Sequence, residues 1–275
     1  DGADYTLSGT QIVIAAGDTS GSVTITAADD AVDEPDETKM EFAAAQAIYG
    51  LIRALDPYHP VYLVNNRPHT YASYVEASDI LAVDVYPIPR YPITRVRDHI
   101  QQARWTSLGR KPVWLVAQAF GGVEHWPRAP TAVELRNMIY QGLIQGARGV
   151  LFYRYCQEEE RDIQPSDLWR EVQALAAELA ELAPVLVQSA YGAGPRQVGG
   201  GVEVAIREYQ RDFYVFVVNV DNEPRRLDMR LDGLPPVDRA QVLYGLSQPS
   251  LGNGRLSAEL APLGTAVYRL ETAGI

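Results

Sequence analysis

The spacing of apolar and polar positions changes twice along the chain and divides it into three segments. Residues 4–30 alternate with the two-residue period of β-strands, interrupted by Gly, Asp and Ser at turn positions. From residue 39 the spacing becomes helical, with apolar side chains at i, i+3 and i+4, namely Phe42, Ala45, Ile48, Leu51, Ile52 and Leu55. These patterns predict a β-hairpin or short meander followed by a helix over residues 39–55.

Strand-like and helix-like patterns then alternate up to about residue 188. Apolar strand-like runs occupy residues 60–66, 79–88, 111–120 and 146–155, and helical patterns occupy residues 69–78, 93–109, 131–146 and 167–182. Thr131 and Glu134 have the spacing of a capping box at the start of one helix. Strands this apolar, separated by helices, predict parallel βα units with both sheet faces covered. The expected sheet has four strands, or five if residues 22–30 join it.

The third segment, after Gly194, has the period of β-strands again. Strand-like runs at residues 201–210, 212–221, 225–234, 240–245 and 264–271 are divided by Gly, Pro, Asn and Asp. Short strands at this density predict a small antiparallel β-sandwich packed on the preceding segment. The expected domains are therefore residues 1–38, 39–190 and 191–275.

Composition and charge limit the kinds of partner. The chain has 275 residues, 47% of them hydrophobic and 21% charged, which is enough apolar material for a core. It contains no apolar run near 18 residues, so we expect no membrane span. The net charge of −11 repels phosphate backbones and argues against nucleic acid as a partner. A single cysteine, Cys156, and four scattered histidines offer no metal-ligand spacing, so we expect no metal and no cofactor.

Two stretches near the N-terminus carry a family resemblance. The run DYTLSGT at residues 4–10 and the acidic run DEPDE at residues 33–37 resemble the end of a Calx-β repeat. The resemblance covers about the first 38 residues and implies a fragment of a β-sandwich. Such a fragment cannot bury both faces of a sheet alone, so we expect it to pack on the rest of the chain.

The middle segment resembles the last four βα units of a bacterial TIM-barrel glycoside hydrolase. The similar stretches are LDPYHPVYLVNN, DILAVDVYPI, KPVWLVAQAFGG, ELRNMIYQGLIQGARGVLFYRY and LWREV, and ELAPLGTAVYRLE resembles the last strands of the β-sandwich appended to many such enzymes. A complete barrel needs eight units and about 250 residues. The resemblance therefore implies an α/β fold with half a (β/α)8 barrel between an N-terminal β-hairpin or meander and a C-terminal antiparallel β-sandwich. A fusion at the DEPDE stretch would account for the missing half.

The resemblance also implies where catalysis would take place. Barrel enzymes carry their catalytic groups at the C-terminal ends of strands, and hydrolysis needs two carboxylates there. Glu34, within DEP, has the position of the acid/base, whereas Gln118 stands where the family has its nucleophilic glutamate. An amide is neither nucleophile nor base, so Asp84 is the best remaining second carboxylate. The alternatives are that Asp84 caps a loop or binds a sugar hydroxyl, and that Glu34 belongs to an exposed acidic loop, residues 29–37. A further alternative is that this loop holds calcium, as Calx-β domains do.

Aromatic and amide side chains at or just beyond the strand ends suit a sugar ligand, because aromatic faces stack on pyranose rings and amides bond hydroxyls. The candidates are Asn65, Asn66, Tyr86, Gln118, Phe120, Trp126, Tyr153 and Tyr155. The alternative for each is ordinary packing. The chain contains no GxSxG, P-loop or GxGxxG motif that would indicate another chemistry.

Three hypotheses for function follow. The first is a glycoside-hydrolase-like protein, weakly active or inactive because of the truncated barrel and Gln118. The second is a non-catalytic module that binds carbohydrate or serves a structural role, and the third is a chance fusion without selected function. A half barrel leaves sheet edges and an inner face uncovered, so we expect a homodimer in which two halves shield each other. Family habit alone suggests secretion or another extracytoplasmic location.

Overall fold

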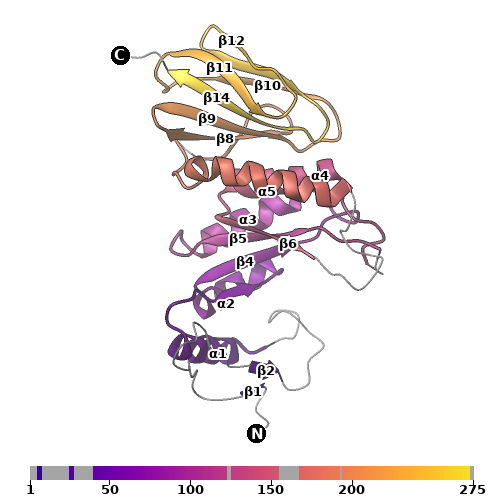
Figure 1. Cartoon of the computed structure of the whole chain (residues 1–275), viewed down its shortest axis with the longest axis vertical. Coiled ribbons are helices and arrows are strands. Elements are labelled where there is room, and N and C mark those ends of the chain that lie inside the picture. The colour runs from indigo at the N-terminus through magenta and orange to yellow at the C-terminus, as the bar shows by residue number, and fades with distance from the viewer. Residues whose placement is uncertain are drawn as a thin grey trace, which may run out of the picture. The chain divides into compact units, whose positions relative to one another are not determined.

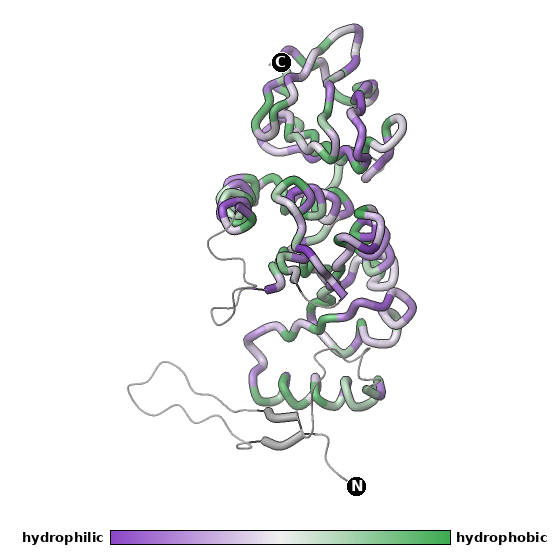
Figure 2. Tube along the Cα trace, turned by 90° about the vertical axis from the view of Figure 1, so that its right-hand side faces the viewer, coloured by the Kyte–Doolittle hydropathy of each residue, from purple (hydrophilic) through white to green (hydrophobic). Residues whose placement is uncertain are grey.

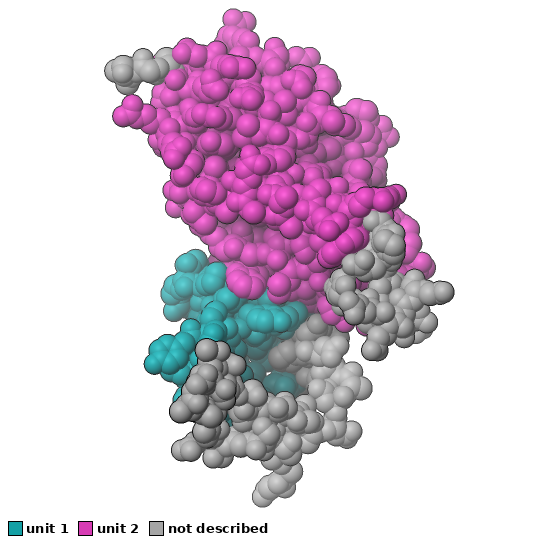
Figure 3. All heavy atoms as spheres, in the orientation of Figure 1, with its two compact units in different colours: residues 1–82, 105–112 teal, residues 83–104, 113–275 magenta. Residues whose placement is uncertain are grey.

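The computed structural model describes residues 40–122, 125–154, 167–192 and 194–272, together with the backbone of two short strands that precede them. The chain forms two compact units (Figure 3), residues 1–82 with 105–112 and residues 83–104 with 113–275. The boundary between the units falls inside a strand of the parallel sheet. The domain limits expected at residues 38 and 190 stay predictions.

The N-terminal segment contributes a small sheet of its own. Strand β1, Tyr5–Leu7, pairs antiparallel with β2, Ile25–Ala27, so that Thr6 lies opposite Thr26. Strand β2 therefore belongs to a two-stranded sheet and not to the parallel sheet, which excludes the five-stranded alternative. The remainder of the Calx-β-like stretch, including the acidic residues 29–37, lies outside the described residues.

The parallel sheet has four strands in the order β3-β4-β5-β6 (Figure 1), and each lies within a predicted run. Their bounds are β3 Tyr62–Val64, β4 Ile80–Val85, β5 Val113–Gln118 and β6 Gly149–Tyr153. All six residues of β4 are buried, which explains why its sequence is apolar without alternation. The expected class, α/β with a partial barrel of parallel βα units, is confirmed.

Helices alternate with these strands along the chain, as the helical spacing predicts. Their bounds are α1 Phe42–Leu55, α2 Tyr71–Tyr74, α3 Arg95–Thr106, α4 Ala132–Gln145 and α5 Asp167–Leu186. The single helix expected over residues 69–78 is instead three short pieces. The four-residue helix α2 is flanked by 3₁₀ segments at Pro68–Thr70 and Val75–Ala77. The predicted capping box is present, with the Thr131 side chain accepting from the Glu134 main-chain N–H at the start of α4.

In the first unit, Asp79 joins α1 to the beginning of the parallel strands. Its carboxylate accepts from the Tyr49 hydroxyl at 2.7 Å and from the Val61 main-chain N–H at 2.8 Å. Burial alone would raise the pKa of Asp79, but these hydrogen bonds and the charges of Arg53 and Lys111 hold it below its usual value. Helix α1 itself is largely apolar along its length (Figure 2), in keeping with the spacing that predicts it.

The C-terminal strands form two antiparallel sheets that share one hydrophobic core. The five-stranded sheet has the order β11-β14-β9-β8-β7 and the three-stranded sheet the order β10-β13-β12. The bounds are β7 Arg196–Gln197, β8 Val202–Tyr209, β9 Asp212–Asn219, β10 Arg225–Arg230, β11 Val237–Tyr244, β12 Ser250–Gly252, β13 Arg255–Leu260 and β14 Thr265–Thr272. The expected antiparallel domain is present, and β7, β12 and β13 are strands that the sequence pattern did not single out.

Within the second unit the five-stranded sheet packs directly on helices of the barrel half (Figure 1). The buried amide of Asn137 on α4 donates to the carbonyls of Asn219, at 2.8 Å, and Leu263, at 2.9 Å. Arg97 on α3 forms an ion pair of 2.7 Å with Glu203 on β8, whose side chain is almost fully buried. These contacts make the antiparallel sheets and the later βα units one compact body.

Candidate functional site

The C-terminal ends of β5 and β6 lie side by side in the second unit. Gln118 and Tyr153 are register partners in the parallel pair, and the Ala119 main-chain N–H donates to the Tyr153 carbonyl at 2.6 Å. Because parallel strands end at one edge of the sheet, side chains that follow these positions are brought together. Ligands of barrel enzymes bind at this edge.

Four aromatic side chains meet there, and we call them the aromatic cluster: Tyr86, Phe120, Trp126 and Tyr153. The rings of Tyr86 and Tyr153 are stacked, with centroids 5.7 Å apart and planes 21° from parallel. Phe120 meets both edge to face, at 5.1 Å from Tyr86 and 5.5 Å from Tyr153. Trp126 completes the group at 5.9 Å from Tyr86 and 5.4 Å from Phe120. The four rings therefore support one another in a fixed arrangement.

Exposure differs within the aromatic cluster. Tyr153 is 39% exposed, whereas the other three members are half-buried. The indole N–H of Trp126 donates to the Tyr86 carbonyl at 3.0 Å, so its polar atom is already used within the protein. Tyr153 is thus the most exposed member of the cluster and rests on the rings of Tyr86 and Phe120, which is an arrangement able to stack on a flat apolar face of a ligand.

The loop that carries Trp126 is fastened at its base. A Cβ placed on Gly121 would lie 1.9 Å from the Ala129 nitrogen, so glycine is required for the two ends of the loop to approach this closely. Arg128 forms a two-pronged ion pair with Glu134, with N–O distances of 2.7 and 2.8 Å. Glu134 also closes the capping box of α4, and this couples the loop to the start of that helix.

Gln118, which the sequence resemblance aligns with the nucleophile of glycoside hydrolases, is fully buried and held by main-chain partners. Its Oε1 accepts from the Ile88 N–H at 2.9 Å, and its Nε2 donates to the carbonyls of Ile88 at 2.8 Å and Phe120 at 3.3 Å. Both ends of the amide are therefore engaged. In this position Gln118 fixes the loop after β4, which also carries Tyr86.

The structure describes only one of the two candidate catalytic carboxylates, Asp84. Asp84 lies near the end of β4 and is 2% exposed, in agreement with its expected place at a strand end. Glu34 and the candidate sugar contact Tyr155 lie outside the described residues. The separation of Glu34 and Asp84, which would distinguish retaining from inverting geometry, remains untested.

Asn65 and Asn66 follow β3 and belong to the first unit. The Asn65 Oδ1 accepts from the Arg67 N–H at 2.9 Å and from the Thr70 hydroxyl at 3.0 Å, which is the bonding of a turn-forming asparagine. Within the described part of the chain its buried Nδ2 has no hydrogen-bond partner. Asn66 is half-buried beside it.

Three residues that support the aromatic cluster were not among the sequence candidates: Gly121, Arg128 and Glu134. Two features of the sequence mark the ends of the loop that carries Trp126. They are the Gly121–Gly122 pair and the capping-box spacing of Glu134 with Thr131. The ion pair with Arg128 had no signal, since its geometry depends on how the loop folds.

Among the described residues, no helix is long and apolar enough to cross a membrane. In the same parts of the chain, no three side chains of His, Cys, Asp or Glu are grouped so that they would hold a metal ion.

Comparison with known proteins gives structural similarity alone. No protein-family model and no curated protein matches the sequence. Among solved structures, an α-amylase from Anoxybacillus superposes with a TM-score of 0.58 and 9% identity, over 85% of this chain and 57% of that one. A GH27 β-L-arabinopyranosidase from Geobacillus stearothermophilus, in complex with arabinose, has a TM-score of 0.58, 15% identity, and coverage of 85% and 55%.

A third similar structure is AmyP in complex with maltose, with a TM-score of 0.55 and 10% identity, over 86% of this chain and 63% of AmyP. Identities this low establish the fold only. This chain therefore has a distant structural resemblance to glycoside hydrolases, of which it spans less than two thirds of the length.

Proposed function

We propose that this chain binds carbohydrate at the aromatic cluster and hydrolyses it weakly or not at all. The observation that carries the proposal is Tyr153, a residue 39% exposed at the C-terminal end of β6 whose ring is stacked on Tyr86. The C–H face of a pyranose is a flat apolar surface that packs on such a ring, while its hydroxyls bond polar groups around it.

Rigidity of the cluster favours binding. A stacking residue that is free to rotate loses side-chain entropy when a ligand orders it, whereas a ring held by neighbours has already lost most of that freedom. Tyr153 contacts both Tyr86 and Phe120, and Trp126 is fixed by its hydrogen bond to the Tyr86 carbonyl. The ligand then gains the contact at a smaller entropic cost.

Hydrolysis is disfavoured by the chemistry at the end of β5. Gln118 is an amide whose two ends are bound to Ile88, so it supplies neither a nucleophile nor a base to a ligand. A pair formed by Glu34 and Asp84 is the remaining catalytic alternative. It requires the two carboxyl groups to lie about 5–5.5 Å apart for retention or about 6.5–9.5 Å apart for inversion.

Sugars for the test are suggested by the similar structures, since AmyP was solved with maltose and with maltotriose and the arabinopyranosidase with arabinose. Titration calorimetry with maltotriose and with arabinose should give heat of binding for the wild-type chain with at least one of them. Tyr153→Ala should weaken that binding at least about tenfold, because the stacking face is lost. Tyr209→Ala, which removes a half-buried ring of the antiparallel sheets, is the matched control.

Equal affinity of the wild-type chain and Tyr153→Ala would contradict the proposal, as would absence of binding to both sugars at millimolar concentration. Binding that is lost in Tyr209→Ala and kept in Tyr153→Ala would place the sugar on the antiparallel sheets instead. Circular dichroism of each variant checks that the fold is retained.

Further expectations from the sequence stay proposals. The N-terminal 38 residues are proposed to be a Calx-β fragment fused to the barrel half, and export from the cytoplasm is proposed from family habit. Within the described residues β6 has only β5 as a strand neighbour, which supports the proposed homodimer through half-barrel surfaces. A chance fusion without selected function is the outcome if no sugar binds.

A further inference from the structure

Helix α5 carries two apolar stripes, and one of them is exposed. The first stripe includes Leu175 and Leu182, which are buried in the second unit. The second stripe consists of Leu179, Ala183 and Val187, and Val187 is 65% exposed. Positions four residues apart lie on one face of a helix, so the second stripe is a continuous apolar surface.

A groove of about 310 Å³ lies between this second stripe and the beginning of β6. Leu143 at the end of α4 and Val150 on β6 form its other walls, and most of its lining is apolar. Among the described residues, one charged side chain lines the groove, and this is Arg148. The volume is at the lower end of the range of small-molecule sites, about 300–1,000 Å³. A groove of this size and lining suits a small, largely aliphatic ligand.

Arg148 belongs to a group of three guanidinium groups, with Arg104 and Arg207, at the C-terminal ends of α4 and α5. Each donates to main-chain carbonyls there, at 2.7 Å from Arg104, at 3.0 Å from Arg148 and at 2.5 and 3.2 Å from Arg207. Within the described parts of the chain, neither Arg148 nor Arg207 has a carboxylate partner. The two helix ends supply about half a negative charge each, which is less than the charge of Arg148 and Arg207 alone.

Arg207 shows the effect of this excess of positive charge. It is 4% exposed, and burial, followed by the charges of Arg148 and Arg104, lowers its pKa to about 10. An anion near this group would stabilise its charged form. The whole chain has a net charge of −11, so the positive potential at this place is local.

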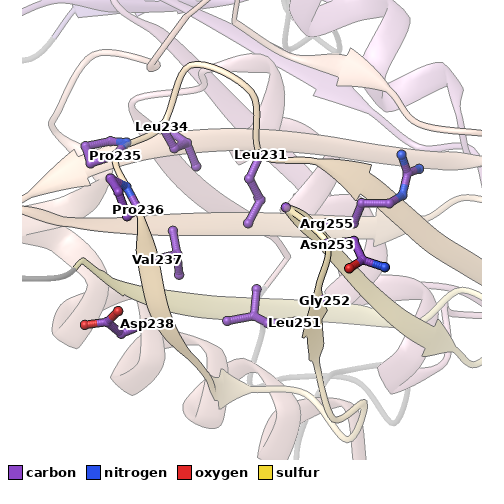
Figure 4. Close-up of a pocket in the computed structure, with 11 residues that line it drawn as sticks. Leu231, Leu234, Pro235, Pro236, Val237, Asp238, Leu251, Gly252, Asn253 and Arg255 are labelled. Carbon is purple, nitrogen blue, oxygen red and sulfur yellow. The ribbon is translucent and has the colours of Figure 1, made fainter.

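The cavity of about 360 Å³ beside the beginning of β11 is different (Figure 4). It also contains aliphatic side chains, such as Leu231 and Leu251, but polar and apolar surface contribute about equally to its lining. The guanidinium of Arg255 there is bound to Asp228 at 2.6 Å, and Asp238 adds a negative charge. This cavity therefore offers no cation to an acidic ligand.

We propose that the groove between α5 and β6 binds a small aliphatic carboxylate, with its chain along the second stripe and its carboxylate at Arg148. Nη1 of Arg148 is used by the Leu186 carbonyl, so Nε and Nη2 remain for the two carboxylate oxygens. A single negative charge is sufficient, because Arg104 and Arg207 do not line the groove. The groove lies at the beginning of β6, whereas Tyr153 is at its end, so this proposal does not rest on the sugar site.

The probes are octanoate, octanol and octylammonium, which share an aliphatic chain and differ in the charge of the head group. Titration calorimetry should show octanoate binding to the wild-type chain at least about threefold more tightly than octanol, and octylammonium more weakly than both. In Arg148→Gln the preference for octanoate over octanol should disappear while octanol still binds. This ratio separates a charge contact from a purely structural role of Arg148.

A second variant tests the groove itself. Ala183 is an exposed residue of the lining, and the ring in Ala183→Phe would occupy the groove and weaken the binding of octanoate and octanol at least about tenfold. Ala177→Phe is the matched control, because Ala177 is exposed on the same helix and does not line the groove. It should bind like wild type, and circular dichroism checks that each variant is folded.

Absence of octanoate binding to wild type at millimolar concentration overturns the proposal, as does equal binding by wild type and Ala183→Phe. Binding that is lost in Leu251→Asp and kept in Ala183→Phe also overturns it, because the chain would then lie in the cavity beside β11. Maltotriose titrated into Ala183→Phe should give the wild-type result. The carboxylate site and the sugar site can therefore fail independently.

Discussion

Gln118 holds Ile88 by both of its main-chain groups, accepting from the N–H at 2.9 Å and donating to the carbonyl at 2.8 Å. The two residues are 30 positions apart and both are buried. An amide side chain is able to do this because it carries a donor and an acceptor together. A carboxylate in the same place would repel the carbonyl, so the contact depends on glutamine where the resemblance leads one to expect glutamate.

The change Gln118→Glu should therefore destabilise the protein. The variant loses the donor to the Ile88 and Phe120 carbonyls and buries an ionisable group, at a cost of about 2–4 kcal/mol near pH 7. Urea unfolding followed by circular dichroism measures it. Gln102→Glu, at an exposed position of α3, is the control and should change the free energy of unfolding by less than about 0.5 kcal/mol. Equal stability of the two variants would argue against the importance of the contact.

The position of Trp126 should depend on the glycine at the base of its loop. In Gly121→Ala the added methyl would meet the main chain at Arg128 and Ala129, so the loop must shift and carry Trp126 away from Tyr86. We expect a changed tryptophan fluorescence spectrum and, if the sugar site is as proposed, at least about tenfold weaker binding.

Gly50→Ala is the control for that change. Gly50 lies in α1 with open space around its Cα, so alanine there should stabilise the helix by about 0.5–1 kcal/mol and leave the tryptophan spectrum unchanged. A Gly121→Ala variant with wild-type fluorescence would mean that the loop tolerates the methyl group.

A buried ion pair between α4 and α5 offers a larger effect on stability. Arg136 contacts Glu178 at 2.8 Å and Glu171 at 2.6 Å, and Glu178 is only 5% exposed. Arg136→Ala leaves a buried carboxylate without its cation, so the free energy of unfolding should fall by about 3–5 kcal/mol. Unfolding in urea would reveal this loss.

The control for Arg136 is Arg170→Ala, which removes one side of the exposed pair with Asp167 and should cost less than about 1 kcal/mol. The double change of Arg136→Met with Glu178→Leu should recover part of the loss, because the most buried carboxylate is removed with its cation, while Glu171 and the Tyr140 hydroxyl each lose a partner. A double variant as unstable as the single one would show that packing, and not charge, causes the effect.

Local patterns were sufficient to predict most of the architecture. The capping box at Thr131 and the fully buried run of β4 are properties of neighbouring residues, and each corresponds to an observed element. The turns around α2 and the short strand β12 were missed because three- or four-residue elements carry too few positions for a period to be recognised.

The candidate site was predictable in part for a different reason. The sequence pattern puts Tyr86, Phe120 and Tyr153 at or just beyond strand ends, and parallel strands place their ends at one edge, where these rings are in contact. The support of that group depends on contacts between distant residues, such as Gln118 with Ile88, which no local pattern encodes.

Stability should fall in mild acid because of His99. The ring is 6% exposed on α3, and burial, followed by the charge of the nearby Arg95 guanidinium, lowers its pKa to about 4. The Arg95 Nε also donates to the His99 Nε2 at 3.1 Å. The unfolded chain has an ordinary histidine pKa of about 6.5 and so binds more protons between pH 6.5 and 4. The contribution of His99 to the free energy of unfolding is therefore constant above about pH 7. By pH 4 the free energy of unfolding has fallen by on the order of 1–3 kcal/mol from this cause.

The measurement for His99 is the urea midpoint at several pH values in wild type and in His99→Gln. The difference between the two should shrink or reverse as the pH falls from 7 to 4, because only wild type loses this contribution. His69→Gln, at an exposed position, is the control and should follow wild type at every pH. A constant difference between wild type and His99→Gln would contradict the assignment.

Finally, the chain should not hydrolyse common aryl glycosides above the background rate. The strand end that should supply a nucleophile carries Gln118, and its amide is bound to Ile88. Release of nitrophenol from α- and β-linked substrates at high protein concentration is the assay, with heat-denatured protein as the blank. Turnover that disappears in both Glu34→Gln and Asp84→Asn, while Gln102→Glu keeps it, would contradict this prediction and indicate catalysis by Glu34 and Asp84. General acid/base catalysis and nucleophilic attack each need an ionisable group, which the amides of these variants cannot replace.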